Sequence, residues 1–270
     1  VAGVTVNRFC GSSMQAIHMA AGAINSGAGE AFLCGGVESM TRIPMGGFNP
    51  MPNPALVKSY PQAYIGMGET AENVGKKYGI TRVAQEEFAL KSHQKAAAAA
   101  AAGKFKDEIV AIGDVASDGC IRPETTMEAM ATLKPAFDTA GTVTAATSSP
   151  VTDGAAVTLV CSAEFAKKHG LKPMAKIRGM AVSGCAADIM GMGPVGASQK
   201  ALDRAGLKLS DMDIIELNEA FAAQSLGVIT EMKAPLEKIN LDGGAIALGH
   251  PLGASGARIT AKAASLLQRE

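Results

Sequence analysis

The sequence lacks an excess of charge of either sign, because its 25 basic residues are balanced by 25 acidic ones. A chain without net charge offers no broad basic surface for nucleic acid. It also lacks an apolar run of the roughly 20 residues that a transmembrane helix needs, and no basic and apolar leader opens it. We therefore expect a cytoplasmic protein that has no membrane span and binds no nucleic acid.

Cysteine pairs with the spacing of a metal site are also missing. The cysteines are odd in number, and no two of them stand in a C-x-x-C pair. This pattern predicts neither a disulfide framework nor a zinc site, and we expect no bound metal. The cysteines are Cys10, Cys34, Cys120, Cys161 and Cys185.

Hydrophobic residues make up 47% of the 270 residues, which is typical of a globular protein with a substantial core. Short apolar runs alternate with segments of helical periodicity, and this alternation predicts an α/β fold with a largely parallel sheet. Residues 40–80 show no sustained periodicity and are predicted to form an inserted loop region. Strands are predicted at residues 4–6, 31–34, 108–115, 141–146, 175–182 and 214–217, and helices at residues 12–25, 81–102, 154–160, 194–205, 219–232 and 257–269.

Cys10 lies in the segment NRFCGSSM, where a predicted strand ends and a helix begins. A thiol at this place faces the unpaired N–H groups and the positive dipole end of the helix, and both favour the thiolate. Gly11 leaves room for a substrate to approach the sulfur. These features make Cys10 a candidate nucleophile, and the alternative is a buried structural cysteine.

His250 and Asn218 are the other two candidates. His250 lies in the glycine-rich segment GGAIALGHPLGASGAR, where an imidazole can reach a thiol, although a turn histidine bonded to backbone is the alternative. Asn218 heads NEAFAAQ directly after an apolar strand, where α/β proteins place ligands. Its amide can hold a water or an oxyanion, and the alternative is a helix N-cap. Glu219 beside it is either catalytic or a favourable acid in a first helical turn.

Five motifs follow one another along the chain: NRFCGSSMQA at Cys10, GGVESM at Gly35, GTVTAATSSPVTDGAA at Gly141, NEAFAAQ at Asn218 and GGAIALGHPLGASGAR at Gly243. Together they resemble the thiolase family over essentially the whole sequence, with the degradative bacterial 3-ketoacyl-CoA thiolases as the nearest resemblance. The family implies a thiolase-like five-layered α/β/α/β/α fold of two similar halves with an inserted loop domain. The implied division is 1–39 with 151–171 for the N-terminal half, 40–150 for the loop domain and 172–270 for the C-terminal half.

The resemblance also implies the roles of individual residues. Cys10 would be the acyl-accepting nucleophile, and His250 would activate it and contribute to an oxyanion hole. Asn218 would hold the water that completes this hole. Contacts with coenzyme A and the border of the acyl pocket would come from Ser149, Met40 and Phe221.

The activity implied is that of an acyltransferase that cleaves 3-ketoacyl-CoA with coenzyme A into acetyl-CoA and a shortened acyl-CoA. The reaction is reversible Claisen chemistry through a cysteine thioester, and the enzyme would be an acetyl-CoA C-acyltransferase or C-acetyltransferase of fatty acid β-oxidation. Coenzyme A would be a substrate, with no permanently bound cofactor. The resemblance further implies a homodimer or homotetramer and leaves room for a β-oxidation partner subunit.

The sequence departs from the family pattern in three places. It contains neither the strand-rich segment that precedes the first motif in the family nor the final C-x-G segment with a second cysteine. We therefore expect a fold truncated at both ends and a chain that is essentially inactive alone. Thr147 stands where the family has asparagine, which weakens the expected coenzyme contact near Ser149.

The residues leave two other functions open. A cysteine hydrolase could use Cys10, His250 and Asn218, with water rather than coenzyme A as the acceptor. A non-catalytic relative could bind acyl-CoA or lipid without forming an acyl-enzyme.

Overall fold

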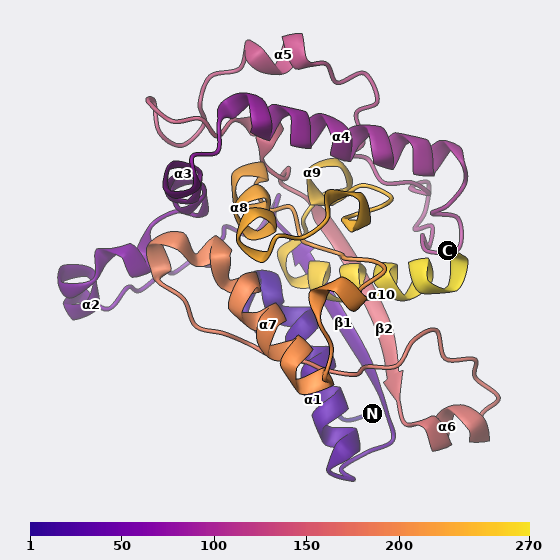
Figure 1. Ribbon diagram of the computed structural model, residues 1–270. Coiled ribbons are helices and arrows are strands. Elements are labelled where there is room, and N and C mark those ends of the chain that lie inside the picture. Colours follow the sequence, from indigo (N-terminus) through magenta and orange to yellow (C-terminus); the bar gives the residue numbers. More distant parts are fainter. The chain divides into compact units, whose positions relative to one another are not determined.

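The computed structural model describes residues 1–270, and Figure 1 shows their elements. The chain forms two compact units, each made of segments that are distant in the sequence. The first unit contains residues 1–45, 151–180 and 250–270, and the second unit contains residues 46–150 and 181–249. None of the helices is both long and apolar enough to cross a membrane. The three-part division that the resemblance implies stays a prediction.

The first unit is built around one antiparallel pair of strands, β1 (Ala31–Ser39) and β2 (Asp153–Cys161). Helices α1 (Ser12–Asn25) and α10 (Leu252–Arg269) contact each other, and each contacts both strands. Figure 1 shows the two strands side by side. A short helix, α6 (Ala163–Lys168), follows β2. The buried residues between α1 and the strands are Ile17, Ala20 and Cys34.

β2 occupies the place of the helix predicted at residues 154–160, and that prediction is wrong. Val157 and Leu159 are exposed, and Ala156, Thr158 and Val160 beside them are partly buried, which is the period of two of a strand. Asp153 resembled a helix cap in the sequence, but its side chain accepts a hydrogen bond of 2.9 Å from the N–H of Thr41 and another from the Thr41 hydroxyl. Asp153 thus joins the start of β2 to the segment after β1, and the pairing is antiparallel rather than parallel.

Helix α1 has the predicted bounds, residues 12–25, so this prediction is confirmed. β1 was predicted to end at Cys34 but continues through Gly35 and Gly36. A Cβ at Gly36 would lie 2.0 Å from the carbonyl oxygen of Gly253, so α10 approaches β1 there backbone to backbone. α10 itself begins at Leu252 rather than at the predicted residue 257, because its glycines serve this close packing and not a turn.

The second unit is mostly helical. Its longest helix, α4 (Arg82–Ala101), begins after Thr81, whose hydroxyl accepts a hydrogen bond from the N–H of Ala84. The helix predicted at residues 81–102 is therefore confirmed. The region predicted as an inserted loop also contains two helices. The further helices are α2 (Pro54–Ser59), α3 (Met67–Tyr78), α5 (Met127–Ala131), α7 (Gly193–Ala205), α8 (Ala222–Met232) and α9 (Ala245–Leu248).

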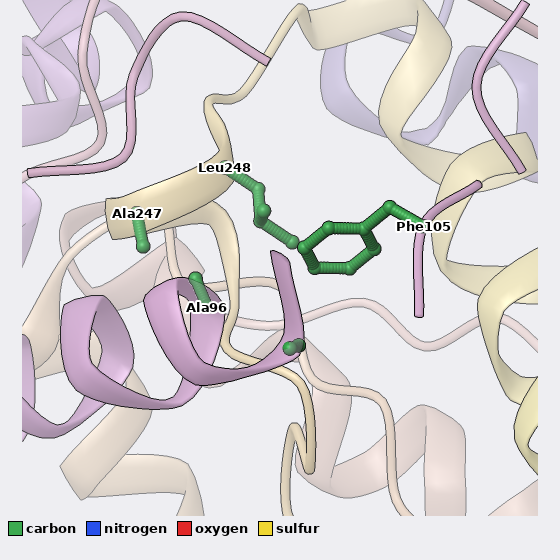
Figure 2. Packing of buried hydrophobic residues seen from close by; sticks show 5 residues of the cluster. Ala96, Phe105, Ala247 and Leu248 are labelled. Atoms are coloured by element: carbon green, nitrogen blue, oxygen red, sulfur yellow. The ribbon is translucent and has the colours of Figure 1, made fainter. Parts of the chain in front are cut away.

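The alanine run at the end of α4 forms part of the core of the second unit. Ala96 and Ala99 are buried in one cluster with Phe105 and with Ala247 and Leu248 of α9. Figure 2 shows the Leu248 side chain beside the Phe105 ring, with Ala96 on the neighbouring helix. Because each alanine carries only a methyl group, α4 and α9 can pack closely.

Several predicted strands are not strands in the structure. An apolar alternation forms a strand only where a neighbour lies beside it, and these segments have at most single bridges. The helix predicted at residues 194–205 is confirmed by α7, and the one predicted at 219–232 is shorter, since α8 begins at Ala222. Residues 4–6 and 175–182 join no ladder, and residues 108–115, 141–146 and 214–217 contain only the bridges Ile112↔Val115, Pro135↔Thr144 and Ile215↔Ile239.

Gly36→Ala tests the close approach of β1 and α10. Its Cβ would overlap the backbone of Gly253, so we expect the substitution to destabilise the protein by about 3 kcal/mol. Gly35→Ala is the matched control, because the nearest atom to a Cβ there lies at 3.8 Å. We expect the control to change the free energy of unfolding by less than about 0.5 kcal/mol. Urea unfolding measures both values, and equal stability of the two variants would contradict this packing.

Candidate active site

Cys10 lies in a single 3₁₀ turn, Phe9–Gly11, directly before α1. The Ser12 hydroxyl donates to the carbonyl of Phe9 at 2.7 Å and accepts from the N–H of Arg8 at 2.8 Å. Phe9 has a φ of 45°, in the left-handed region that side chains rarely adopt, so the turn stores backbone strain. These contacts fix the thiol at the N-terminal end of the helix, where the sequence predicted it.

The electrostatic surroundings of Cys10 differ from the prediction. Burial raises the pKa of the Cys10 thiol; a hydrogen bond from its own backbone N–H opposes this, and the charge of Glu38 adds to it. The expectation that the helix start favours the thiolate is therefore wrong as a net effect, because desolvation outweighs it. A thiol in this state needs a base before it can attack a substrate.

His250 lies just before α10 and is 3% exposed. Its backbone N–H donates to Thr152 Oγ1 at 3.2 Å, and its Nδ1 lies 2.6 Å from Ser255 Oγ. The Ser255 hydroxyl can donate to the carbonyl of Pro251 at 3.2 Å, and it then accepts a hydrogen bond from Nδ1–H. In this tautomer the lone pair of the imidazole lies on Nε2, as a general base requires.

The protonation state of His250 leaves its ring available to accept a proton, although its low pKa makes it a weak base. Burial, followed by the positive charge of Arg258, lowers its pKa to about 4. The ring is therefore neutral at physiological pH and can take up a proton. The alternative of a turn histidine bonded only to backbone is not what the structure shows, since the ring contacts the Ser255 side chain.

The structure brings the Cys10 turn and the start of α10 together within the first unit. α10 contacts the Cys10 turn as well as α1. The N–H of Ala257 donates to Ser13 Oγ at 2.8 Å, and a Cβ at Gly256 would lie 2.3 Å from the backbone nitrogen of Met14. The N-terminal turns of α1 and α10 thus pack against each other, each directly after its candidate catalytic residue.

Glu38 is a residue of this site that the sequence analysis did not single out. Its Oε2 accepts a hydrogen bond of 3.0 Å from the N–H of Gly253, three residues after His250. Glu38 is the glutamate of the motif GGVESM, which the sequence analysis quoted. Nothing in the sequence indicates which group this carboxylate bonds to.

Asn218 and Glu219 belong to the second unit. α8 begins at Ala222 with Phe221 as its N-cap, so Asn218 does not cap this helix. Glu219 is 2% exposed, and its carboxylate accepts hydrogen bonds from Asn240 Nδ2 at 2.7 Å, from Ser92 Oγ at 2.6 Å and from the N–H of Ile246 at 3.2 Å. Glu219 therefore holds the segment that carries Asn218 against α4 and α9.

The residues predicted to contact coenzyme A and the acyl group lie in both units. Ser149 donates its N–H to the carbonyl of Ala220 at 3.0 Å, beside the Asn218 segment of the second unit. Phe221 stacks edge to face on Phe137, with ring centroids 5.7 Å apart. Met40 follows β1 in the first unit. No group of three or more His, Cys, Asp or Glu side chains is arranged to hold a metal ion.

Comparison with known proteins identifies the family. The model of the thiolase N-terminal domain matches residues 1–164, and that of the thiolase C-terminal domain matches residues 171–270. The chain belongs to the thiolase family. A 3-ketoacyl-CoA thiolase of Idiomarina loihiensis is 52% identical over all of this chain and 73% of its own length, and one of Shewanella loihica is 54% identical over 98% of this chain and 72% of its own.

Solved thiolase structures confirm the fold. Human mitochondrial 3-ketoacyl-CoA thiolase superposes with a TM-score of 0.89 at 41% identity, over 98% of this chain and 72% of the human chain. Its complex with CoA gives a TM-score of 0.88 at 42% identity. The predictions of a thiolase fold and of a thiolase acyltransferase are confirmed, while the roles of individual residues stay predictions.

Stability below neutral pH tests the burial of His250. Its pKa is lower in the folded chain than in the unfolded chain, so the unfolded state binds the extra proton first as the pH falls. We expect the folded chain to lose on the order of 3 kcal/mol between about pH 6.5 and 4 through this group.

Chemical unfolding at pH 7 and pH 4.5 measures this loss in the wild type and in His250→Gln. The variant should lose markedly less stability between the two pH values. His169→Gln, at the exposed end of α6, is the control and should lose as much as the wild type. An equal loss in His250→Gln would show that His250 is not buried as a neutral ring.

Glu219→Gln tests the hydrogen-bond network of the second unit. Asn240 donates to one oxygen of this carboxylate, and Ser92 and the N–H of Ile246 donate to the other, so the amide NH₂ of glutamine would face a donor whichever way it turns. We expect a loss of about 1–3 kcal/mol in the free energy of unfolding. Glu237→Gln, on an exposed turn of the same unit, should change it by less than about 0.5 kcal/mol. A Glu219→Gln protein as stable as its control would refute the network.

Proposed function

We propose that Cys10 of this chain carries the thioester through which 3-ketoacyl-CoA and coenzyme A are converted into acetyl-CoA and a shortened acyl-CoA, and that the chain alone forms this thioester but completes little turnover. The observation that carries the proposal is the packing of α10 on the Cys10 turn, which joins a protonated thiol to the segment of a neutral, buried imidazole. The names of the relatives and the CoA complex of the human enzyme support the choice of substrate.

The reaction begins with a proton transfer from the Cys10 thiol to His250. The thiolate attacks the 3-keto carbon, and the bond between C2 and C3 breaks with its electron pair going to C2. This step leaves an acyl thioester on Cys10 and the enolate of acetyl-CoA, whose C2 takes up the proton that His250 received from the thiol. Coenzyme A then gives its thiol proton to His250 and attacks the thioester carbonyl. The bond between the acyl carbon and the Cys10 sulfur breaks, the shortened acyl-CoA leaves, and the Cys10 thiolate takes the proton back from His250.

Asn218 supplies an amide for the oxygen of the enolate, through a water that it holds. The carboxylate of Glu219 supports this role, because its three buried hydrogen bonds leave the adjacent residue little freedom. Ser149 and Met40 contact coenzyme A, and Phe221 borders the acyl pocket. Coenzyme A is a substrate in this scheme, and the protein needs no permanently bound cofactor.

The cellular setting follows from the same assignment. The enzyme acts in the cytoplasm as a homodimer or homotetramer, and a partner subunit of fatty acid β-oxidation would deliver its 3-ketoacyl-CoA. The bacterial 3-ketoacyl-CoA thiolases among the relatives support this setting.

Acylation of the chain by acetyl-CoA tests the nucleophile, because this half-reaction needs only Cys10 and its base. We expect intact mass spectrometry to show one acetyl group per chain, and peptide mapping to place it on Cys10. Cys10→Ser should abolish the thioester, and His250→Gln should slow its formation about 100-fold, the usual contribution of a general base.

Cys185→Ser is the control, because Cys185 is exposed in the second unit and should be dispensable. Addition of coenzyme A should discharge the acetyl group and regenerate acetyl-CoA. Discharge by water at the same rate would instead indicate a hydrolase. Acyl-CoA binding without any thioester on Cys10 would contradict the proposed function.

A further inference from the structure

One carboxylate connects the two candidate catalytic residues of the first unit. Glu38 stands near the end of β1, and its Oε2 accepts a hydrogen bond of 3.0 Å from the N–H of Gly253 in the first turn of α10. The N-cap of α10 is Pro251, which has no side chain able to cap the helix. Glu38 therefore satisfies an N–H group that α10 cannot satisfy itself, and its negative charge meets the positive end of the helix dipole.

This capping contact holds the first turn of α10, which directly follows His250 in the chain. His250 is tied to α10 by the contact of its Nδ1 with Ser255, one turn into the helix. The orientation of the imidazole thus depends on where α10 begins and how firmly its first turn is held. Glu38 holds this turn from a separate element, the strand β1.

The same charge acts on the nucleophile. Glu38 is the charged side chain that raises the pKa of Cys10, in addition to burial. Around the pair, α10 contributes Arg258, whose charge acts on His250, and Arg8 precedes the Cys10 turn with its guanidinium bonded to Gln15. Neither cation bonds to Glu38, so its negative charge is felt at the sulfur.

We propose that Glu38 is a positioning residue with two effects: it anchors the start of α10 that orients His250, and its negative charge acts on the Cys10 sulfur because α10 packs on the Cys10 turn. This inference rests on the proposed acyl transfer at Cys10. Glu38 itself need not touch the substrate.

Two substitutions separate the two effects. Glu38→Gln removes the charge but keeps an oxygen that can accept from the N–H of Gly253, whereas Glu38→Ala removes both. Glu30→Gln is the matched control, because Glu30 is exposed just before β1, about 26 Å along the strand from Glu38. All three variants remove one negative charge from the first unit.

The charge effect is measured by the pH profile of iodoacetamide alkylation at Cys10, followed by mass spectrometry. We expect Glu38→Gln and Glu38→Ala to shift the profile to lower pH and to raise the rate at pH 7 roughly threefold. Glu30→Gln should keep the wild-type profile. A purely structural role would leave the profile of Glu38→Gln unchanged, and that result would overturn the electrostatic part of the proposal.

The anchoring effect is measured by the rate of acetylation of Cys10 by acetyl-CoA. We expect Glu38→Ala to lower the maximal rate about tenfold, with the half-saturating concentration of acetyl-CoA unchanged, because the base is misplaced. Glu38→Gln should restore the rate to within about threefold of the wild type. A wild-type rate in Glu38→Ala, or no restoration in a folded Glu38→Gln protein, would overturn the anchoring role.

The two readouts also separate this inference from the proposed function. If the wild type never acquires an acetyl group on Cys10, the proposed function fails whatever the variants do. If the wild type is acetylated but both Glu38 variants behave like Glu30→Gln, only the role of Glu38 fails. Should Glu38→Ala not fold, the alkylation profile and acetylation rate of Glu38→Gln still decide the charge effect.

Discussion

The candidate active site depends on one steric constraint, the approach of the first turn of α10 to β1 and α1 without intervening side chains. Gly36, Gly253 and Gly256 make this approach, and a Cβ at Gly36 or Gly256 would lie within 2.3 Å of a backbone atom of the opposite element. Close contact of backbones requires glycine on the approaching faces, at a cost in chain entropy. The contact is what brings the turn of Cys10 to the helix that follows His250.

The same close packing determines the chemistry of the pair. Removing water raises the pKa of Cys10 and lowers that of His250, so both shifts favour a neutral thiol and a neutral imidazole. A buried neutral pair avoids the desolvation of two charges, which an imidazolium–thiolate pair would require. In the proposed mechanism, the proton moves from Cys10 to His250 when a substrate carbonyl is present to accept the developing negative charge. Burial thus couples the reactivity of the thiol to the occupancy of the site.

Local patterns in the sequence predicted the helix after Cys10 better than the strands around it, while the roles of the site residues stay predictions. The bounds of α1 followed from its apolar stripe, and Cys10 and His250 were found from the turn and the glycine-rich segment. The segment of β2 was mistaken for a helix because aspartate is a common helix N-cap residue. The partner of Asp153 in the structure is instead Thr41, which lies 112 residues away in the sequence. The first turn of α10 was missed because glycine indicates a turn unless the surface packed against it is known.

Two carboxylates hold the glycine-rich segment, one on each side of His250. Local sequence patterns could not predict the partner of either carboxylate. Glu219 accepts from the N–H of Ile246 in the second unit, and Glu38 accepts from the N–H of Gly253 in the first. A segment with so few side chains cannot fix its own conformation, since glycine has more backbone freedom than any other residue. Its backbone N–H groups remain available as hydrogen-bond donors. An acceptor side chain from another element can hold the segment through them, at the cost of ordering that one side chain. The backbone on both sides of the imidazole is therefore held by side chains of other elements, and these partners can be recognised only in three dimensions.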